Sequence, residues 1–275
     1  MKKNSDHRTV ESFGDEWNRF DQSVLSCTEA LRIFGDYFEI FPWDKLPKMA
    51  SGFDMGCGTG RWARFVAPRV GCLHCIDPSS ALEIAKKSLN SFCNVKFYQA
   101  SVDDKLLPPN SQDFGYSLGV LHHIPDTAAA IRSCVAMLKP GAPFLIYLYY
   151  AFDNRSFLFR SIWRCSDLLR WIICRLPGKP KNFVTDLLAL LIYWPLAQIA
   201  RLGERLGMEV SAFPLSYYRN HSFYTMRTDS RDRFGTPLEQ RFTKIRIEEM
   251  MRSAGLRQIH FSRNAPFWCA IGFKE

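Results

Sequence analysis

Residues 53–61 read Phe-Asp-Met-Gly-Cys-Gly-Thr-Gly-Arg. The stretch begins at the end of a short apolar run, continues with an acid, and then has three glycines at alternating positions. The apolar run predicts a buried strand, and a helix-forming segment follows at Arg61–Ala67. A glycine-rich turn between a strand and a helix lets the backbone approach a ligand, and it presents helix N-terminal amides to a negative group. We therefore expect a ligand site at this turn.

The turn does not match the two common phosphate-binding motifs. A P-loop ends in Gly-Lys-Ser or Gly-Lys-Thr, which is absent here, and the dinucleotide fingerprint needs a glycine where this chain has Arg61. The spacing that fits is Asp-x-Gly-x-Gly-x-Gly, which consists of Asp54, Gly56, Gly58 and Gly60.

The residues around the turn alternate apolar runs with helix-like segments, which indicates βαβ units and a parallel sheet covered on both faces. We expect helices near Arg61–Ala67, Ser79–Leu89, Thr127–Leu138 and Ile245–Ala254. We expect strands near Ala50–Asp54, Cys72–Ile76, Val95–Gln99, Phe114–Leu118, Phe144–Tyr149, Gln258–Arg263 and Phe267–Phe273.

Polar or glycine-containing segments follow the second, third and fourth strands. Asp77 comes about 20 residues after the glycine turn, where an acid can bind ribose hydroxyls. Val102-Asp103 follows the third strand, and Leu118-Gly119 ends the fourth. Ligands of such sheets bind at the carboxyl ends of the strands, so these segments predict one shared site.

With these motifs, residues 50–150 resemble the class I S-adenosylmethionine-dependent methyltransferases, particularly the branch of the ubiquinone and menaquinone C-methyltransferases. The resemblance implies a Rossmann-like, seven-stranded, mostly parallel sheet with its last strand antiparallel. It also implies S-adenosylmethionine as cofactor: Asp54, Gly56, Gly58 and Gly60 around its methionine part, Asp77 at the ribose, Val102 and Asp103 beside adenine, and Leu118 and Gly119 below the sulfonium. The family often has glycine where this chain has Val102.

Two further segments resemble the same family. His122 and His123 follow the fourth strand near the expected methyl group, where a histidine could deprotonate an acceptor; packing of both rings is the alternative. Ser12–Phe20 resembles a lead-in helix that covers the cofactor, with Trp17 and Phe20 as shielding or packing aromatics.

Residues 151–243 interrupt the alternating pattern. Two apolar-rich helices are expected at Phe157–Cys174 and Phe183–Leu206, and residues 151–182 carry seven basic and two acidic side chains. This mixture suits either a substrate lid or a helix on an anionic membrane surface. The apolar run Leu187–Ala197 is shorter than the about 20 residues that span a bilayer, so we predict no transmembrane segment.

The aromatic and basic stretch at 217–229 predicts a polar pocket. Its candidates for contact with substrate are Arg219, His221, Tyr224 and Arg227, the arginines through pairing with carboxylate or phosphate. We thus divide the chain into a cap helix and cofactor-binding core (1–150), an insertion (151–243) and a closing helix with strands (244–275).

The composition is that of a folded protein, with 47% apolar and 23% charged residues and a net charge of +9. Nine scattered cysteines indicate a reducing cytoplasm, and the polar residues after Met1-Lys2-Lys3 do not predict a signal peptide. Cys72 and Cys75 have CxxC spacing, but a strand turns them to opposite faces, so no metal is expected.

These observations predict an enzyme that transfers a methyl group from S-adenosylmethionine to oxygen or carbon of a small apolar or membrane-borne molecule, in the cytoplasm or at the membrane periphery. Two alternatives are an RNA methyltransferase and a non-catalytic S-adenosylmethionine-binding partner protein. Nucleic acid is the weaker choice of substrate, because the Asn/Asp-Pro-Pro-Tyr/Phe motif of base amino-methylating enzymes is absent after the fourth strand.

Overall fold

The computed structural model describes residues 3–275. Met1 and Lys2, which contributed to the expectation about a signal peptide, lie outside the described residues. The chain forms two compact units, the first made of residues 1–21, 30–151 and 238–275 and the second of residues 22–29 and 152–237. The second unit therefore ends before the predicted boundary at residue 243, and it includes a short N-terminal segment that we did not expect.

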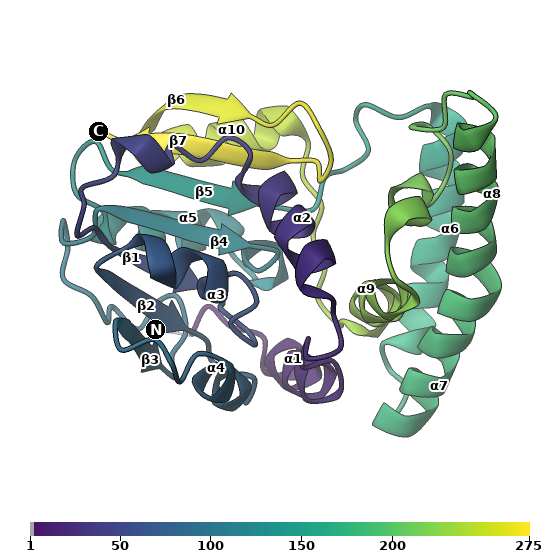
Figure 1. The fold of residues 1–275 in the computed structure, drawn as a ribbon, viewed down its shortest axis with the longest axis horizontal. Coiled ribbons are helices and arrows are strands. Elements are labelled where there is room, and N and C mark those ends of the chain that lie inside the picture. Colours follow the sequence, from purple (N-terminus) through teal and green to yellow (C-terminus); the bar gives the residue numbers. More distant parts are fainter. Residues whose placement is uncertain (1–2) are drawn as a thin grey trace. The chain divides into compact units, whose positions relative to one another are not determined.

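Unit 1 is built on one seven-stranded sheet with the order β3-β2-β1-β4-β5-β7-β6 (Figure 1). Strand β7 pairs antiparallel with β5 and with β6, and the other pairs are parallel. The strands are β1 (Ser51–Met55), β2 (Cys72–Ile76), β3 (Val95–Tyr98), β4 (Phe114–Leu118), β5 (Pro143–Tyr147), β6 (Leu256–Phe261) and β7 (Cys269–Lys274). The predicted mostly parallel sheet with an antiparallel last strand is confirmed.

Helices cover both faces of this sheet, as the parallel strands require. They are α1 (His7–Arg19), α2 (Cys27–Phe38), α3 (Ala63–Val66), α4 (Leu82–Ser88), α5 (Thr127–Met137) and α10 (Lys244–Ser253). Helix α5 begins at an Asp126 side chain that accepts the Ala129 amide, and α1 begins in the same way at Asp6. Helix α4 starts three residues later than predicted, because Ser79 is bonded to Asp77.

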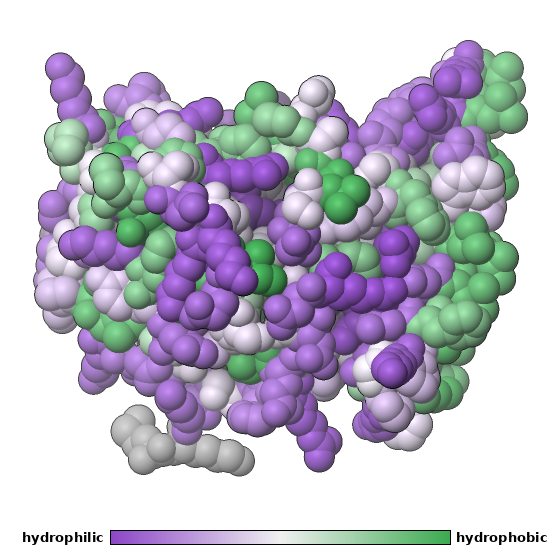
Figure 2. Space-filling view, turned by 60° about the horizontal axis from the view of Figure 1, so that its bottom comes forward, coloured by the Kyte–Doolittle hydropathy of each residue, from purple (hydrophilic) through white to green (hydrophobic). Residues whose placement is uncertain are grey.

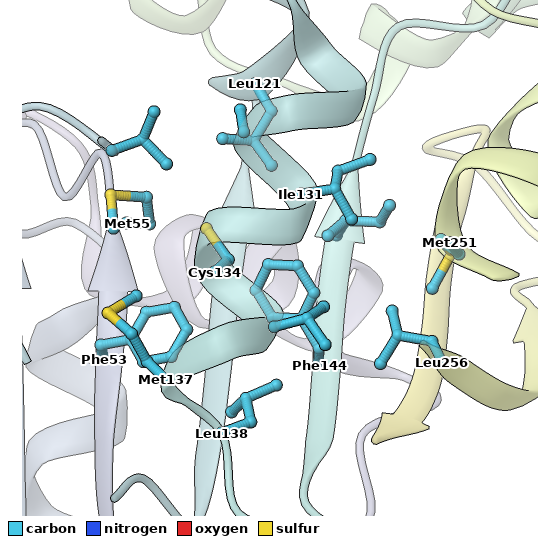
Figure 3. Packing of buried hydrophobic residues seen from close by; sticks show 14 of the residues in the cluster. Phe53, Met55, Leu121, Ile131, Cys134, Met137, Leu138, Phe144, Met251 and Leu256 are labelled. Carbon is cyan, nitrogen blue, oxygen red and sulfur yellow. The ribbon is translucent and has the colours of Figure 1, made fainter. Parts of the chain in front are cut away.

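The core of unit 1 lies between the sheet and helices α5 and α10 (Figure 3). Phe53 and Phe144 project from neighbouring parts of the sheet, while Ile131 and Cys134 face them from α5, and all four are fully buried. Strand β5 is buried over most of its length, and its sequence is accordingly a continuous apolar run rather than an alternating one.

Unit 2 is helical (Figure 1). It contains α6 (Phe157–Ile173), α7 (Gly178–Leu188), a π-helical turn (Ala189–Tyr193), α8 (Trp194–Arg205) and α9 (Phe223–Gly235). Helix α9 was missed, because the apolar and polar residues of 207–243 follow no clear period. The π turn lies directly before Pro195, which lacks the backbone donor that a regular helix would use.

Helices α7 and α8 continue through the π turn as one helix, Gly178–Arg205, of 28 residues. At 1.5 Å per residue it is about 42 Å long, and by length and composition it could cross a membrane. The prediction of no transmembrane segment considered only the apolar run Leu187–Ala197, which is part of this longer helix, and it stays a prediction.

Truncation of the core tests this packing. We expect Phe144→Ala to lower the free energy of unfolding by about 3–5 kcal/mol, because it leaves a cavity between the sheet and α5. The exposed Met49→Ala serves as the matched control and should change it by less than about 0.5 kcal/mol. Urea denaturation followed by circular dichroism measures both, and equal effects would contradict the assigned core.

Candidate functional site

The glycine turn after β1 has a backbone conformation that requires glycine. Gly56, Gly58 and Gly60 all have positive φ angles, of 80°, 53° and 79°. A Cβ atom on Gly56 would lie 2.4 Å from a methyl carbon of Val120, so this position is closed to any side chain. Next to Gly58 the nearest atom is the Trp17 indole nitrogen, 3.4 Å from such a Cβ. Trp17 of α1 therefore lies close over the turn at Gly58.

Most amides of this turn are already bonded within the protein. The Gly56 and Cys57 amides donate to the carbonyl oxygen of Ile76, and the Gly60 amide donates to that of Cys57. The Gly58 amide donates to Asp77 Oδ2 at 2.8 Å. We expected the backbone amides near Gly58 to bind a negative ligand group. In this structure the Gly58 amide donates to Asp77 instead.

Asp77 connects the turn after β1 to the turn after β2. Its Oδ1 accepts from the Ser79 amide at 2.8 Å and from the Ser79 hydroxyl at 2.6 Å, while Oδ2 accepts from Gly58. Burial raises the pKa of Asp77, and these hydrogen bonds oppose the shift. The bonds fix the direction of the carboxylate and leave Oδ2 able to accept a further hydrogen bond.

Asp54 stands at the carboxyl end of β1 without such support. Its side chain is 1% exposed, and neither carboxylate oxygen has a hydrogen-bond partner. Burial raises the pKa of Asp54 well above its ordinary value, the Tyr116 hydroxyl opposes the shift, and the charge of Asp77 adds to it. A buried acid of this kind calls for a cationic or hydrogen-bond-donating ligand group.

The two neighbouring acids in the segment after β3 have different partners. Asp104 accepts the Ser101 amide at 2.7 Å and pairs with Lys3, and the Ser101 bond is the larger cause of its lowered pKa. Asp103 accepts the Asn4 amide through Oδ2, but its buried Oδ1 has no partner. Asp104 therefore shapes the turn, and Asp103 retains a free acceptor beside the buried Val102.

The loop after β4 contains the paired histidines. Leu118 ends the strand, and Gly119 has a φ angle of 79° and donates its amide to Tyr147. The His122 ring is fully buried, stacks on Tyr149 with ring centroids 3.9 Å apart, and has no hydrogen-bond partner on either nitrogen. Burial lowers the pKa of His122 well below its ordinary value, helped by the charges of His123 and Arg241. His122 is thus neutral at pH 7.

His123 has a defined tautomer. Its Nδ1 lies 2.6 Å from the carbonyl oxygen of Leu238, which can only accept, so Nδ1 donates, and in the neutral ring the lone pair is on Nε2. Phe13 of α1 contacts the ring edge to face, with centroids 4.8 Å apart. Helix α1 therefore covers both the glycine turn, through Trp17, and the histidine loop, through Phe13.

Sequence reasoning missed a segment of unit 1 at residues 238–242, which we call the strap. The Gln240 amide donates to the carbonyl oxygen of His122, and its side chain donates to that of Ile124. Arg241 lies over the Tyr149 ring at 4.9 Å and pairs with Glu239 at 2.8 Å. No sequence spacing connects residues so far apart, so this contact with the histidine loop was not predicted.

The four candidates at 219–227 all make contacts inside unit 2. Arg219 pairs with Glu204, and Arg227 forms a two-bond pair with Asp186. His221 lies 2.8 Å from the carbonyl oxygen of Tyr217, and the Tyr224 hydroxyl accepts the Gln22 amide. Carboxylates of the chain thus occupy the arginines, which gives them a structural role; contact with substrate stays a prediction.

The CxxC pair makes no cluster of metal ligands. Cys75 is fully buried and Cys72 is half-buried, and both are free thiols. Within residues 3–275, no group of three or more His, Cys, Asp or Glu side chains is arranged to hold a metal ion.

Residues 53–141 match the family described as "Methyltransferase domain". Ubiquinone biosynthesis O-methyltransferase from Marinobacter nauticus is 34% identical over 117 residues, which cover 40% of this chain and 48% of that protein. The enzyme of the same name from Saccharophagus degradans is 36% identical over 106 residues, which cover 38% of this chain and 43% of that protein. The chain spans about half the length of the curated relatives it matches.

Solved structures extend the likeness in fold. An O-methyltransferase family protein from Burkholderia thailandensis aligns with a TM-score of 0.55 at 13% identity, over 94% of this chain and 59% of that chain. A second structure is phosphoethanolamine N-methyltransferase 2 of Haemonchus contortus in complex with phosphomonomethylethanolamine and S-adenosylhomocysteine. It aligns with a TM-score of 0.50 at 17% identity, over 92% of this chain and 46% of that chain. Residues 53–141 of unit 1 thus match a methyltransferase domain, and these solved structures share the fold of the chain.

The unpaired acid of β1 gives a test of the site. We expect Asp54→Asn to stabilise the ligand-free protein at pH 7.5, because the pKa of the native carboxyl is raised by burial, and a raised pKa costs folding free energy at a pH above the pKa of the unfolded chain. The gain should shrink as the pH falls and the wild-type carboxyl becomes protonated. Thermal melts at several pH values measure it.

The same variant should weaken S-adenosylhomocysteine binding by about tenfold or more, since a hydrogen bond to a charged group is lost. Asp113→Asn, on an acid that pairs with Lys139, is the matched control for binding. If Asp54→Asn destabilises the protein and binds S-adenosylhomocysteine as tightly as the wild type, the ligand-binding role of Asp54 is contradicted.

Proposed function

We propose that this protein transfers the methyl group of S-adenosylmethionine to an oxygen atom of a small apolar acceptor. The observation that supports this most is the buried, unpartnered carboxylate of Asp54 beside a glycine turn. A buried acid that has no cationic partner among the described residues is best explained by a ligand that supplies one, and the amino group of S-adenosylmethionine has the required charge.

The other residues of the site fit the same cofactor. Asp77 keeps a free acceptor position on Oδ2 for a ribose hydroxyl, and Asp103 Oδ1 is a free acceptor for the adenosine end. Trp17 lies next to Gly58, where it would cover the bound cofactor, while Leu118 and Gly119 would border the reacting end. The bound cofactor supplies an electrophilic methyl group, and the protein holds it in line with the acceptor and excludes water.

His123 is our candidate for the group that removes the acceptor's proton. The bond from Nδ1 to Leu238 leaves Nε2 as the basic atom. His122 is too enclosed to act as this base, since its stacking on Tyr149 and its low pKa support a packing role. Arg241 of the strap lies over the Tyr149 ring and pairs with Glu239. Tyr149 in turn stacks on His122.

Transfer to oxygen is supported by the named activity of the relatives, ubiquinone biosynthesis O-methyltransferases. A ring hydroxyl becomes strongly nucleophilic once it loses its proton, so transfer to oxygen would use His123 as a general base. Transfer to carbon of an activated ring stays a second candidate for the same site.

An assay with apolar alkyl catechols tests the proposal directly. We expect S-adenosylhomocysteine and an O-methylated product, identified by mass spectrometry, and no methylation of RNA supplied in its place. Product from RNA alone would overturn the choice of acceptor. Binding of the cofactor with no product from any acceptor class would favour a non-catalytic partner protein.

Replacement of His123 tests the proton transfer. We expect His123→Gln to lower kcat by about a hundredfold with a weakly acidic phenol, the usual range for a lost general base, and to lower it much less with a phenol that is already ionised at the assay pH. S-adenosylhomocysteine affinity should be unchanged. The exposed His260→Gln is the control, and an equal loss with both phenols would indicate that His123 only packs.

A further inference from the structure

Unit 2 buries polar side chains and exposes apolar ones. Thr185 and Ser230 are fully buried, and Arg231 is 1% exposed. The Arg231 guanidinium bonds the side chain of Asn182, and the Ser230 hydroxyl donates to the carbonyl oxygen of Thr185. The buried apolar cluster of this unit is small, with members such as Met226 and Phe234. This distribution is the reverse of the one expected for helices that face water.

Many large apolar side chains of the helices in this unit are exposed. Both α6 and α7 pack on α9, so their opposite sides are exposed. We define the apolar face by residues from α6 and from the continuous helix Gly178–Arg205, which are 48% to 69% exposed: Leu158, Ile162, Leu169, Phe183, Leu191 and Leu202. In Figure 2 apolar side chains gather along the right edge of the view. A face of this extent on a chain in water marks a contact surface.

The basic side chains near the apolar face favour contact with an anionic surface. The acids of the two helices, Asp167, Asp186 and Glu204, each pair with an arginine of the unit. Exposed basic side chains remain on the same helices, among them Arg160, Arg164, Lys179 and Arg201. The face is thus apolar with a positive rim.

We propose that this face docks unit 2 onto an anionic lipid bilayer, with α6 and Gly178–Arg205 lying along the membrane surface. Apolar side chains would enter the boundary between headgroups and acyl chains, and the basic rim would meet the anionic headgroups. Trp171 and Trp194, both about half exposed, suit the membrane–water boundary. The inference goes beyond methyl transfer, because it concerns a surface that needs neither cofactor nor acceptor.

Two other occupants fit the observations less well. In a symmetric dimer through this face, each positive rim would lie near the other, which costs binding energy. Insertion of Gly178–Arg205 across the bilayer would carry the Asp186–Arg227 pair and the polar side of α9 into the hydrocarbon, where unsatisfied polar groups are expensive. Docking along the surface keeps those groups on the water side.

Vesicle cosedimentation of the full chain tests the docking. We expect binding to vesicles of phosphatidylcholine and phosphatidylglycerol in equal amounts, weak binding to phosphatidylcholine alone, and release by high salt. The double variant Leu169→Asp with Leu191→Asp should bind at least about tenfold more weakly, because two apolar contacts are replaced by repelled charges. Arg160→Glu with Arg164→Glu should lose a similar factor, and only on anionic vesicles.

Matched controls come from unit 1. Met49→Asp with Ile245→Asp replaces exposed apolar residues, Lys48→Glu with Lys87→Glu reverses exposed charges, and both should bind like the wild type. Circular dichroism confirms that each variant is folded. Equal binding by all variants would overturn the proposal, as would absence of binding by the wild type. So would a soluble dimer that the apolar-face variants dissociate, or protein that resists alkaline extraction from cell membranes, which would indicate a spanning helix.

Discussion

The hydrogen bond from the Gly58 amide to Asp77 holds the two halves of the site together. It joins the turn after β1 to the turn after β2, and those turns stay adjacent because their strands pair in parallel along their full length. Only a glycine with a left-handed backbone directs its amide there without strain. The bond, with those from Ser79, fixes the Asp77 carboxylate before any ligand arrives, so little of the binding energy is spent on ordering it.

The electrostatics of the site follow from the same arrangement. Asp54 and Asp77 are both buried at the ends of neighbouring strands, and the charge of Asp77 adds to the raised pKa of Asp54. Asp77 is compensated by three hydrogen bonds, whereas Asp54 depends on a ligand. Burial thus disfavours the ionised form of Asp54, and in our proposal a cationic ligand group relieves this cost. Such a site gives up stability in the free protein for binding, which is common where function requires it.

The sequence predicted much of the fold of unit 1 and part of its site. Strands β2 and β4 were predicted to the residue, since a short apolar run between turn signals specifies a buried strand, and β7 was expected antiparallel from the resemblance. The ends of helices were less certain: Ser79 belongs to the Asp77 network rather than to α4. The strap was invisible in the sequence, because the contact of Gln240 with the histidine loop depends on the path of the whole chain.

Unit 2 shows a different limit of sequence reasoning. Arginines at 219 and 227 suggested an anionic ligand, but partners on other helices, Glu204 and Asp186, neutralise them, and pairing over such distances leaves no local pattern. Helix α9 was missed because it is polar on nearly every side and is buried by charge pairing rather than by an apolar stripe. The sequence left open whether the apolar residues of its two long helices pack as a lid or lie on a membrane surface, and many of them are exposed.

Calorimetric titration of the purified chain with S-adenosylhomocysteine, and separately with ATP and with NAD, tests the central claim most directly. We predict saturable one-to-one binding of S-adenosylhomocysteine and no measurable heat from the two phosphate-containing ligands, because the turn has its amides occupied and an acid at its base. Binding of NAD or ATP in preference to S-adenosylhomocysteine would contradict it.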